Sequence, residues 1–154
     1  MMSLASDVLA SLKGRTLVTA ESITGGGIGA ILTSVPGASA VYKGGIISYC
    51  DDVKASALGV DPEMLRSIGA VSAPVAECMA RGVRTALQAD VAVSVTGLAG
   101  PDGDSYGNSV GTVFIGYADG DRSLSREHHF SGTRQEIRES TIRAALALIL
   151  EHNK

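Results

Sequence analysis

Residues that could carry out chemistry gather directly after the first apolar stretch of this chain. Residues 16–20 are short, rich in β-branched side chains and uncharged, which is typical of a buried strand. Ser22 follows this strand, and the glycine-rich residues 25–32 then begin a helix. A serine hydroxyl at the end of a strand is a candidate nucleophile, and free amides at a helix start favour an anionic ligand. The sequence therefore predicts that a functional site begins at this turn.

Two further segments place polar groups at the ends of expected strands. Residues 42–49 predict a second strand that ends at Tyr49, and Lys54 follows five residues later. Residues 91–95 predict a third, buried strand, after which Thr96 leads into a glycine-rich loop. Ligands bind beyond the carboxyl ends of the strands in open α/β sheets, so we expect the three segments to converge there. Together they offer a nucleophile, a proton carrier and backbone donors, which acyl transfer requires.

Each of these residues also has an ordinary structural explanation. Ser22 suits a helix N-cap, and Lys54 suits the protein surface, where most lysines lie. Tyr49 suits a packing role with a solvated hydroxyl, and Glu21 suits a role in holding the turn. The conjunction of these residues in three converging loops is what favours a site.

Other ligand motifs fit the chain poorly. Residues 25–30 satisfy a relaxed G-x-G-x-x-A pattern after a strand, but no acidic residue ends the next strand at the distance that a dinucleotide site requires. The later glycine-rich loop contains no Gly-Lys-Ser/Thr. His128, His129 and His152 have no partners at metal-ligand spacing. We therefore predict neither a metal nor a cofactor.

The remaining pattern predicts the elements that hold these segments. Residues 112–117 and 122–130 flank an Asp-Gly turn and predict a hairpin, whose charged second strand suits a sheet edge. Thr133 and Glu136 form a capping-box sequence. Helices are predicted to begin near residues 4, 25, 51, 61, 72 and 133. This order predicts one domain, residues 1–154, with the fold of a three-layer α/β/α sandwich around a mixed, mostly parallel sheet.

Composition narrows the classes of function. The 154 residues are 45% hydrophobic and 19% charged, and the net charge of −3 gives no basic footprint for nucleic acid. Cys50 and Cys78 are too few for a disulfide framework or a zinc site. We expect no signal peptide and no membrane span, because no apolar run approaches about 18 residues. These features favour a cytoplasmic protein with reduced thiols.

Five motifs occur along the chain in a fixed order: residues 20–26, Ser48-Tyr49 with Lys54, residues 97–103, residues 110–113, and residues 130–134 with Ile137-Arg138. In these motifs the chain resembles the CinA C-terminal domain family, whose stand-alone members include bacterial nicotinamide mononucleotide deamidases. The resemblance runs from about Ser6 to the last helix. Family members usually have cysteine where this chain has Ile23, which argues against a catalytic thiol there and leaves the serine chemistry intact.

The resemblance implies hydrolysis of the carboxamide of nicotinamide mononucleotide to nicotinate mononucleotide and ammonia, without a metal. It makes Ser22 the nucleophile, Lys54 the general base, and Tyr49 a proton relay or orienting hydroxyl. A serine needs a neighbour that takes its proton, and a lysine can do so only when it is neutral. Burial would lower the pKa of Lys54, whereas Asp51 and Asp52 would oppose that change if they lie close.

Arg134 is the candidate for the substrate's 5′-phosphate, because its planar guanidinium matches an oxyanion. It could act in its own site or in that of a neighbouring subunit, since the resemblance favours a homodimer or a higher even oligomer. Other candidates for the carboxamide oxygen, the ribose, the phosphate or the shape of the pocket are Thr24, Gly25, Gly26, Ser39, Thr96, Gly97, Ala99 and Gly100.

A second class of function stays open. The same pocket could belong to a non-catalytic, regulatory module that binds pyridine nucleotides, because a fold and its pocket can persist without turnover. Ser22, Tyr49 and Lys54 together favour the enzyme. A binding module should retain its affinity after Ser22→Ala.

Overall fold

A five-stranded mixed sheet forms the middle layer of the structure, a computed structural model that describes residues 1–154. Its order is β2-β1-β3-β4-β5; β1 pairs in parallel with β2 and β3, and β4 is antiparallel to both β3 and β5. Four strands thus run in one direction and β4 alone is reversed, which confirms the mixed, mostly parallel sheet. The strands are β1 (Leu17–Glu21), β2 (Tyr42–Ile47), β3 (Val91–Gly97), β4 (Thr112–Ala118) and β5 (Ser123–His129).

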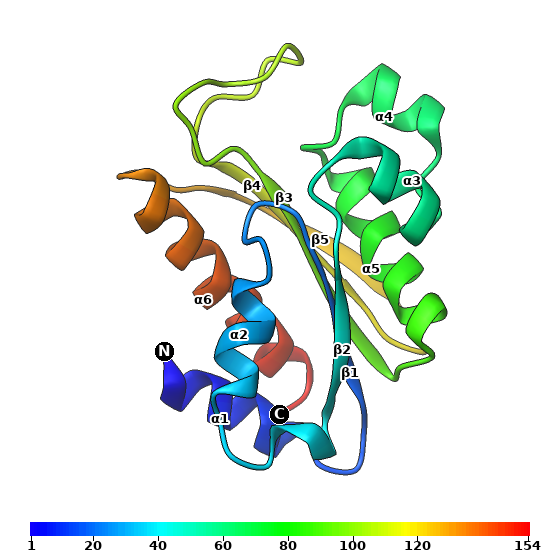
Figure 1. The fold of residues 1–154 in the computed structure, drawn as a ribbon, viewed down its shortest axis with the longest axis vertical. Coiled ribbons are helices and arrows are strands. Elements are labelled where there is room, and N and C mark those ends of the chain that lie inside the picture. The colour runs from blue at the N-terminus through cyan, green and yellow to red at the C-terminus, as the bar shows by residue number, and fades with distance from the viewer.

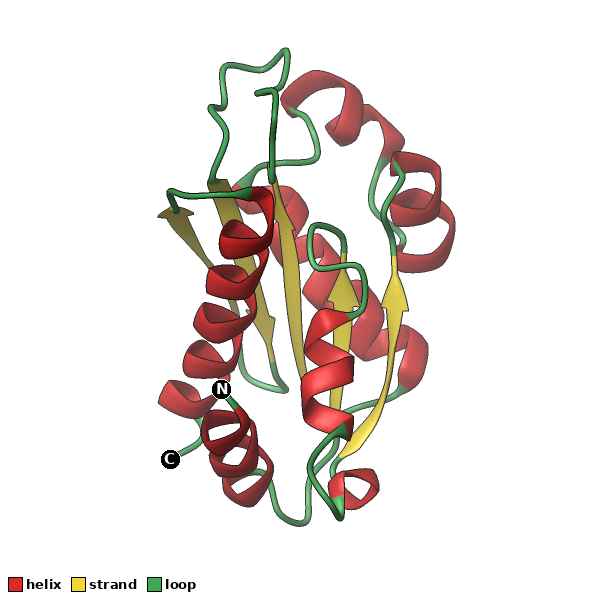
Figure 2. Ribbon diagram, turned by 60° about the vertical axis from the view of Figure 1, so that its left-hand side comes forward, coloured by secondary structure: helices red, strands yellow, loops and turns green.

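Helices cover both faces of the sheet, as Figures 1 and 2 show. One face carries α1 (Met2–Ser11), α2 (Gly27–Thr33) and α6 (Arg134–His152), and these helices share the larger apolar cluster with the sheet. The other face carries α3 (Asp51–Leu58), α4 (Pro62–Ile68) and α5 (Ala73–Leu87), which pack through a second cluster. The predicted three-layer sandwich is confirmed.

Sequence patterns explain where the strands lie. Every residue of β1 is buried, and so are the first six residues of β3, because helices cover both faces of these central strands. The polar strand β5 lies at an edge of the sheet, as its charged side chains predict. The sequence signals for the ends of helices also agree with the structure. Gly59 ends α3 with a φ of +71°, and the Thr133–Glu136 capping box begins α6.

The carboxyl ends of β1, β2 and β3 meet at one edge of the sheet. Glu21, the last residue of β1, pairs with Ile47 of β2 and with Val95 of β3. The residues that follow these three positions therefore lie level with one another. In Figure 1 this edge is at the top, below α4 and the long loop between β3 and β4. No helix is both long enough and apolar enough to cross a membrane.

Candidate active site

A cavity of about 300 Å³ opens at this edge of the sheet. Ser22 and Ile23 line it from the turn after β1, and Tyr49 and Lys54 line it from the segment after β2. Residues 96–100 line it from the end of β3 and the loop that follows, and Arg134 lines it from the first turn of α6. The three segments that the sequence predicts to converge do meet here.

Ser22 and Lys54 form a hydrogen-bonded pair in this cavity. The Nζ of Lys54 lies 3.1 Å from the Oγ of Ser22 and donates to the carbonyl of Ser48 at 2.8 Å. Lys54 is only 2% exposed, so it is not an ordinary surface lysine. Ser22 does not cap α2 either, because the N-cap is Gly26 and no side chain bonds there. The structural explanations that the sequence left open for these two residues therefore do not hold.

The surroundings of Lys54 lower its pKa from the ordinary value of a lysine. Burial lowers the pKa of the Lys54 amine because the charged form loses its hydration, while the nearby Asp51 and Cys50 act to raise that pKa. The Asp51 carboxylate lies 4.0 Å from Nζ and is itself 62% exposed, so its influence is screened by water. Asp51 thus opposes the effect of burial, as predicted. Asp52 is not among the groups that shift the pKa of Lys54, and its carboxylate accepts from the amide of Val53 at 3.0 Å.

A buried carboxylate holds the turn that carries Ser22. Glu21 is 2% exposed, and its Oε1 accepts from the amide of Ile28 at 2.8 Å and from the hydroxyl of Thr24 at 2.6 Å. Its Oε2 accepts from the amide of Gly29 at 3.0 Å. The expectation that the amides at the start of α2 are free for an anionic ligand is therefore wrong. Glu21 already supplies the negative charge that a helix N-terminus favours.

Four expected binding residues, Thr24, Gly25, Gly26 and Ser39, do not line the cavity. The hydroxyl of Thr24 donates to Glu21 instead. A Cβ atom on Gly25 would face the guanidinium of Arg138, and one on Gly26 would face Ile47, so these glycines shape the turn instead. Ser39 lies in the short 3-10 helix Ala38–Ala40, which precedes β2 at the opposite end of the sheet (cyan, bottom of Figure 1). Ser39 thus lies at the other end of the sheet from Ser22, whereas Thr24, Gly25 and Gly26 belong to the turn next to Ser22 but do not line the cavity.

Tyr49 and Arg134 line the cavity and contact each other. The Nη1 of Arg134 donates to the carbonyl of Gly100 at 2.6 Å, and its Nη2 donates to the hydroxyl of Tyr49 at 3.2 Å. Tyr49 is 59% exposed, and its hydroxyl bonds to Arg134 rather than to the side chain of Ser22 or Lys54. Arg134 therefore reaches the cavity of its own chain.

The segment after β3 offers backbone donors. The amides of Ala99 and Gly100 donate to no acceptor within the protein and border the cavity. The hydroxyl of Thr96, in contrast, donates to the carbonyl of Ala70 at 3.0 Å. This segment can therefore offer two N–H groups to a carbonyl oxygen, and the remaining lone pairs of the Thr96 hydroxyl can accept from a donor such as an amide NH₂ group.

Arg138 is a residue of the site that sequence reasoning missed. Its Nε donates to the carbonyl of Ile23 at 3.1 Å, and its Nη2 donates to the carbonyl of Thr24 at 3.0 Å. The one signal in the sequence was the place of Arg138 in the last of the five motifs. Nothing in the local pattern says that a residue of α6 reaches a turn more than a hundred positions earlier.

The histidines and cysteines take ordinary positions. His128 stacks on Phe130, and His152 stacks on Tyr117. Cys50 and Cys78 are both free thiols. No group of three His, Cys, Asp or Glu side chains lies close enough together to hold a metal ion.

Comparison with known proteins shows the family of this chain and agrees with its fold. Residues 2–152 match the family model described as the CinA C-terminal domain. A Pseudomonas putida protein named nicotinamide-nucleotide amidohydrolase PncC is 44% identical over 135 residues, which cover 88% of this chain and 84% of the relative. A CinA-like protein of Thermosynechococcus vestitus is 50% identical over 78% of this chain, but the match spans only 29% of that longer protein.

Solved structures agree as well. The competence/damage inducible protein CihA of Agrobacterium tumefaciens is 38% identical and superposes with a TM-score of 0.95, covering 99% of this chain and 95% of its own. A CinA superfamily protein of Enterobacter cloacae is 32% identical, with a TM-score of 0.96, over 99% of this chain and 92% of its own. By sequence and by structure, the chain belongs to the CinA C-terminal domain family.

Proposed function

We propose that this protein is an amidohydrolase that converts nicotinamide mononucleotide to nicotinate mononucleotide and ammonia. The observation that carries the proposal is the 3.1 Å contact between the Nζ of the buried Lys54 and the Oγ of Ser22. The name of the Pseudomonas putida relative, a nicotinamide-nucleotide amidohydrolase, supports the choice of substrate.

In the proposed mechanism, neutral Lys54 takes the proton of the Ser22 hydroxyl while Oγ attacks the carboxamide carbon. Lys54 then returns the proton to the departing nitrogen, so the C–N bond breaks and ammonia leaves an ester on Ser22. A water molecule attacks this ester as Lys54 accepts its proton, and the same proton restores the Ser22 hydroxyl when nicotinate mononucleotide departs. The lowered pKa of Lys54 supports this role, because only the neutral amine is a base.

The other groups of the cavity would bind the substrate. The free amides of Ala99 and Gly100 are suited to the negative charge that develops on the carboxamide oxygen. Arg134 would exchange its bond to the Tyr49 hydroxyl for the 5′-phosphate, since a guanidinium binds phosphate through two parallel hydrogen bonds. Before substrate binds, the Tyr49 hydroxyl would hold Arg134 in place rather than relay a proton.

The direct test is release of ammonia from nicotinamide mononucleotide in the presence of EDTA. The wild-type protein should release it, whereas Ser22→Ala and Lys54→Ala should not. Ser39→Ala is the matched control, because Ser39 lies at the far end of the sheet. Activity that survives in Ser22→Ala would refute the serine mechanism. A folded wild-type protein that binds the nucleotide without releasing ammonia would instead indicate the non-catalytic binding module.

A further inference from the structure

The guanidinium of Arg138 connects α6 to the turn that carries Ser22. Arg138 lies in the second turn of that helix, and it donates to the carbonyls of Ile23 and Thr24 at 3.1 Å and 3.0 Å. Its side chain is partly buried and forms these two bonds across 115 and 114 positions of the chain. A helix from the end of the sequence thus holds a turn near its beginning.

Backbone hydrogen bonds hold the other parts of this turn. The amide of Ser22 donates to Val95 of β3 at 3.1 Å, and the amide of Gly25 closes the turn by donating to the carbonyl of Ser22, also at 3.1 Å. The carbonyl of Thr24 also accepts from Gly27 at 3.0 Å. The carbonyl of Ile23, directly after Ser22, receives its hydrogen bond from Arg138.

The fit around the guanidinium is close. Gly25 has a φ of +58°, and a Cβ atom at this position would lie 3.4 Å from the Nη2 of Arg138. Glycine therefore provides both the backbone conformation of the turn and the space against which the guanidinium lies. Arg138 can fill this space with a planar group that donates in two directions, which a lysine amine cannot match.

We infer that Arg138 is a positioning residue for Ser22, an inference that rests on the proposed function of the site. The carbonyl of Ile23 belongs to the planar peptide group between Ile23 and Thr24, so holding it fixes the path of the turn one residue beyond Ser22. Arg138 in this way keeps Oγ of Ser22 directed at Nζ of Lys54. It does not touch the reacting atoms itself.

The expected consequence is a loss of reactivity without a loss of fold. A displacement of about 1 Å at a reacting group lowers rates on the order of a hundredfold. Arg138→Met should therefore lower the kcat for nicotinamide mononucleotide by about that factor while it changes KM little, because the substrate-binding groups stay in place. Arg138→Lys should recover part of the loss, since its amine can reach one of the two carbonyls.

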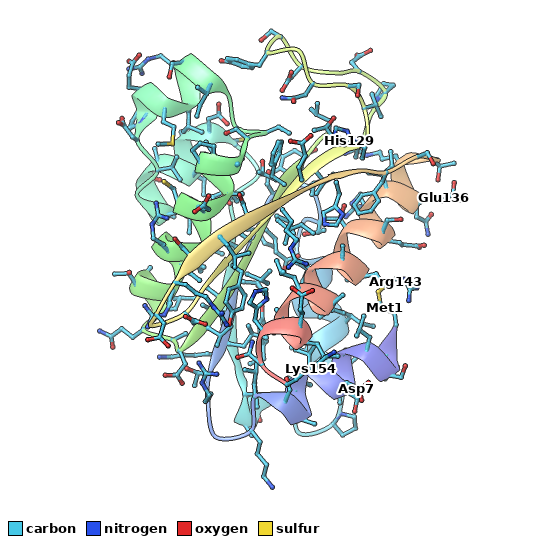
Figure 3. All side chains as sticks on the ribbon, turned by 180° about the vertical axis from the view of Figure 1, so that it is seen from behind. Met1, Asp7, His129, Glu136, Arg143 and Lys154 are labelled. Atoms are coloured by element: carbon cyan, nitrogen blue, oxygen red, sulfur yellow. The ribbon has the colours of Figure 1, made fainter.

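The test measures the reactivity of Ser22 independently of the substrate. A fluorophosphonate probe is added to each variant, and the rate at which Ser22 is modified is followed by mass spectrometry, with circular dichroism as the check of folding. Arg143→Met is the matched control, because Arg143 is an exposed arginine of the same helix and projects away from the sheet (Figure 3). If Arg138→Met does not fold, Arg138→Lys and rescue of Arg138→Ala by guanidinium ion replace it.

The outcomes separate this inference from the proposed function. Slow labelling in Arg138→Met with wild-type labelling in Arg143→Met supports the positioning role, and so does rescue by guanidinium ion. Labelling of a folded Arg138→Met at the wild-type rate overturns it, as does a complete lack of labelling in the wild-type protein. Fast wild-type labelling without hydrolysis of nicotinamide mononucleotide refutes the proposed function alone, and the labelling rates still decide the role of Arg138.

Discussion

Lys54 must be neutral to act as a base, and its burial and the carboxylate of Asp51 influence its pKa in opposite directions. Burial among the loops lowers its pKa, and the carboxylate of Asp51 at 4.0 Å raises it. Activity that depends on neutral Lys54 increases as pH rises through this pKa. The position of that increase on the pH axis therefore reports the balance between burial and Asp51.

Replacement of the Asp51 carboxylate should remove one of the influences that raise the pKa of Lys54. We expect Asp51→Asn to lower the pKa of Lys54 and to move the acidic limb of the kcat/KM profile to lower pH, so that the variant is more active than the wild type on that limb. The measurement is kcat/KM for nicotinamide mononucleotide across the pH range. Asp52→Asn is the control, because Asp52 bonds to the amide of Val53 instead. A limb that stays in place or moves to higher pH would contradict the assignment of Lys54 as the base.

At the scale of elements, the position of Lys54 depends on how closely α3 approaches α5. Gly82 in the middle of α5 faces the last residue of α3, and a Cβ atom at this position would overlap the carbonyl oxygen of Leu58. A glycine inside a helix ordinarily costs about 1 kcal/mol relative to alanine. Here the absence of a side chain allows two helices to pack, and one of them, α3, carries Lys54, the proposed base.

Gly82→Ala should therefore destabilise the protein and lower its activity, although alanine favours helices. Overpacking of this kind costs about 1–3 kcal/mol, and we expect a loss of that size in the free energy of unfolding measured with urea. The rate of ammonia release should also fall, because α3 must move away and take Lys54 with it. Thr85→Ala, an exposed substitution in the same helix, is the control and should be close to neutral. Equal stability of Gly82→Ala and the wild type would mean that the approach of α3 to α5 does not constrain the site.

At the scale of the whole molecule, the cavity joins parts that the fold brings together from distant positions. The turn after β1, the segments after β2 and β3, and α6 each contribute side chains or amides to it. A ligand that contacts all of them binds the folded protein and not the unfolded chain. Binding must therefore raise the stability of the molecule as a whole.

This coupling can be measured as a thermal shift in Ser22→Ala, which should bind nicotinamide mononucleotide without consuming it. Ligand at a hundred times its Kd adds about 2.7 kcal/mol, which for a protein of this size raises Tm by about 5–10 °C. A second substitution, Arg134→Met, should reduce the shift, whereas Ser39→Ala should leave it unchanged. A shift that is insensitive to Arg134→Met would exclude this arginine from substrate binding.

Local signals predicted most of the fold. Strand periodicity, the Asp-Gly turn and the Thr133 capping box act between residues a few positions apart, so they can be read from the sequence. The 3-10 helix Ala38–Ala40 is too short to be predicted in this way, because three residues carry no periodic pattern. The convergence of Ser22 and Lys54 was also predictable, since the ends of parallel strands meet at one edge of a sheet.

The sequence by itself determined the order of the elements, the edge at which polar groups collect and the residue types available for acyl transfer. Only the tertiary structure decided that Lys54 is buried, that Glu21 occupies the amides of α2, and that Arg138 holds the turn after Ser22. It also decided that Ser39 lies at the wrong end of the sheet. Burial and hydrogen-bond partners depend on which distant segments pack together, and no pattern within a few residues contains that information.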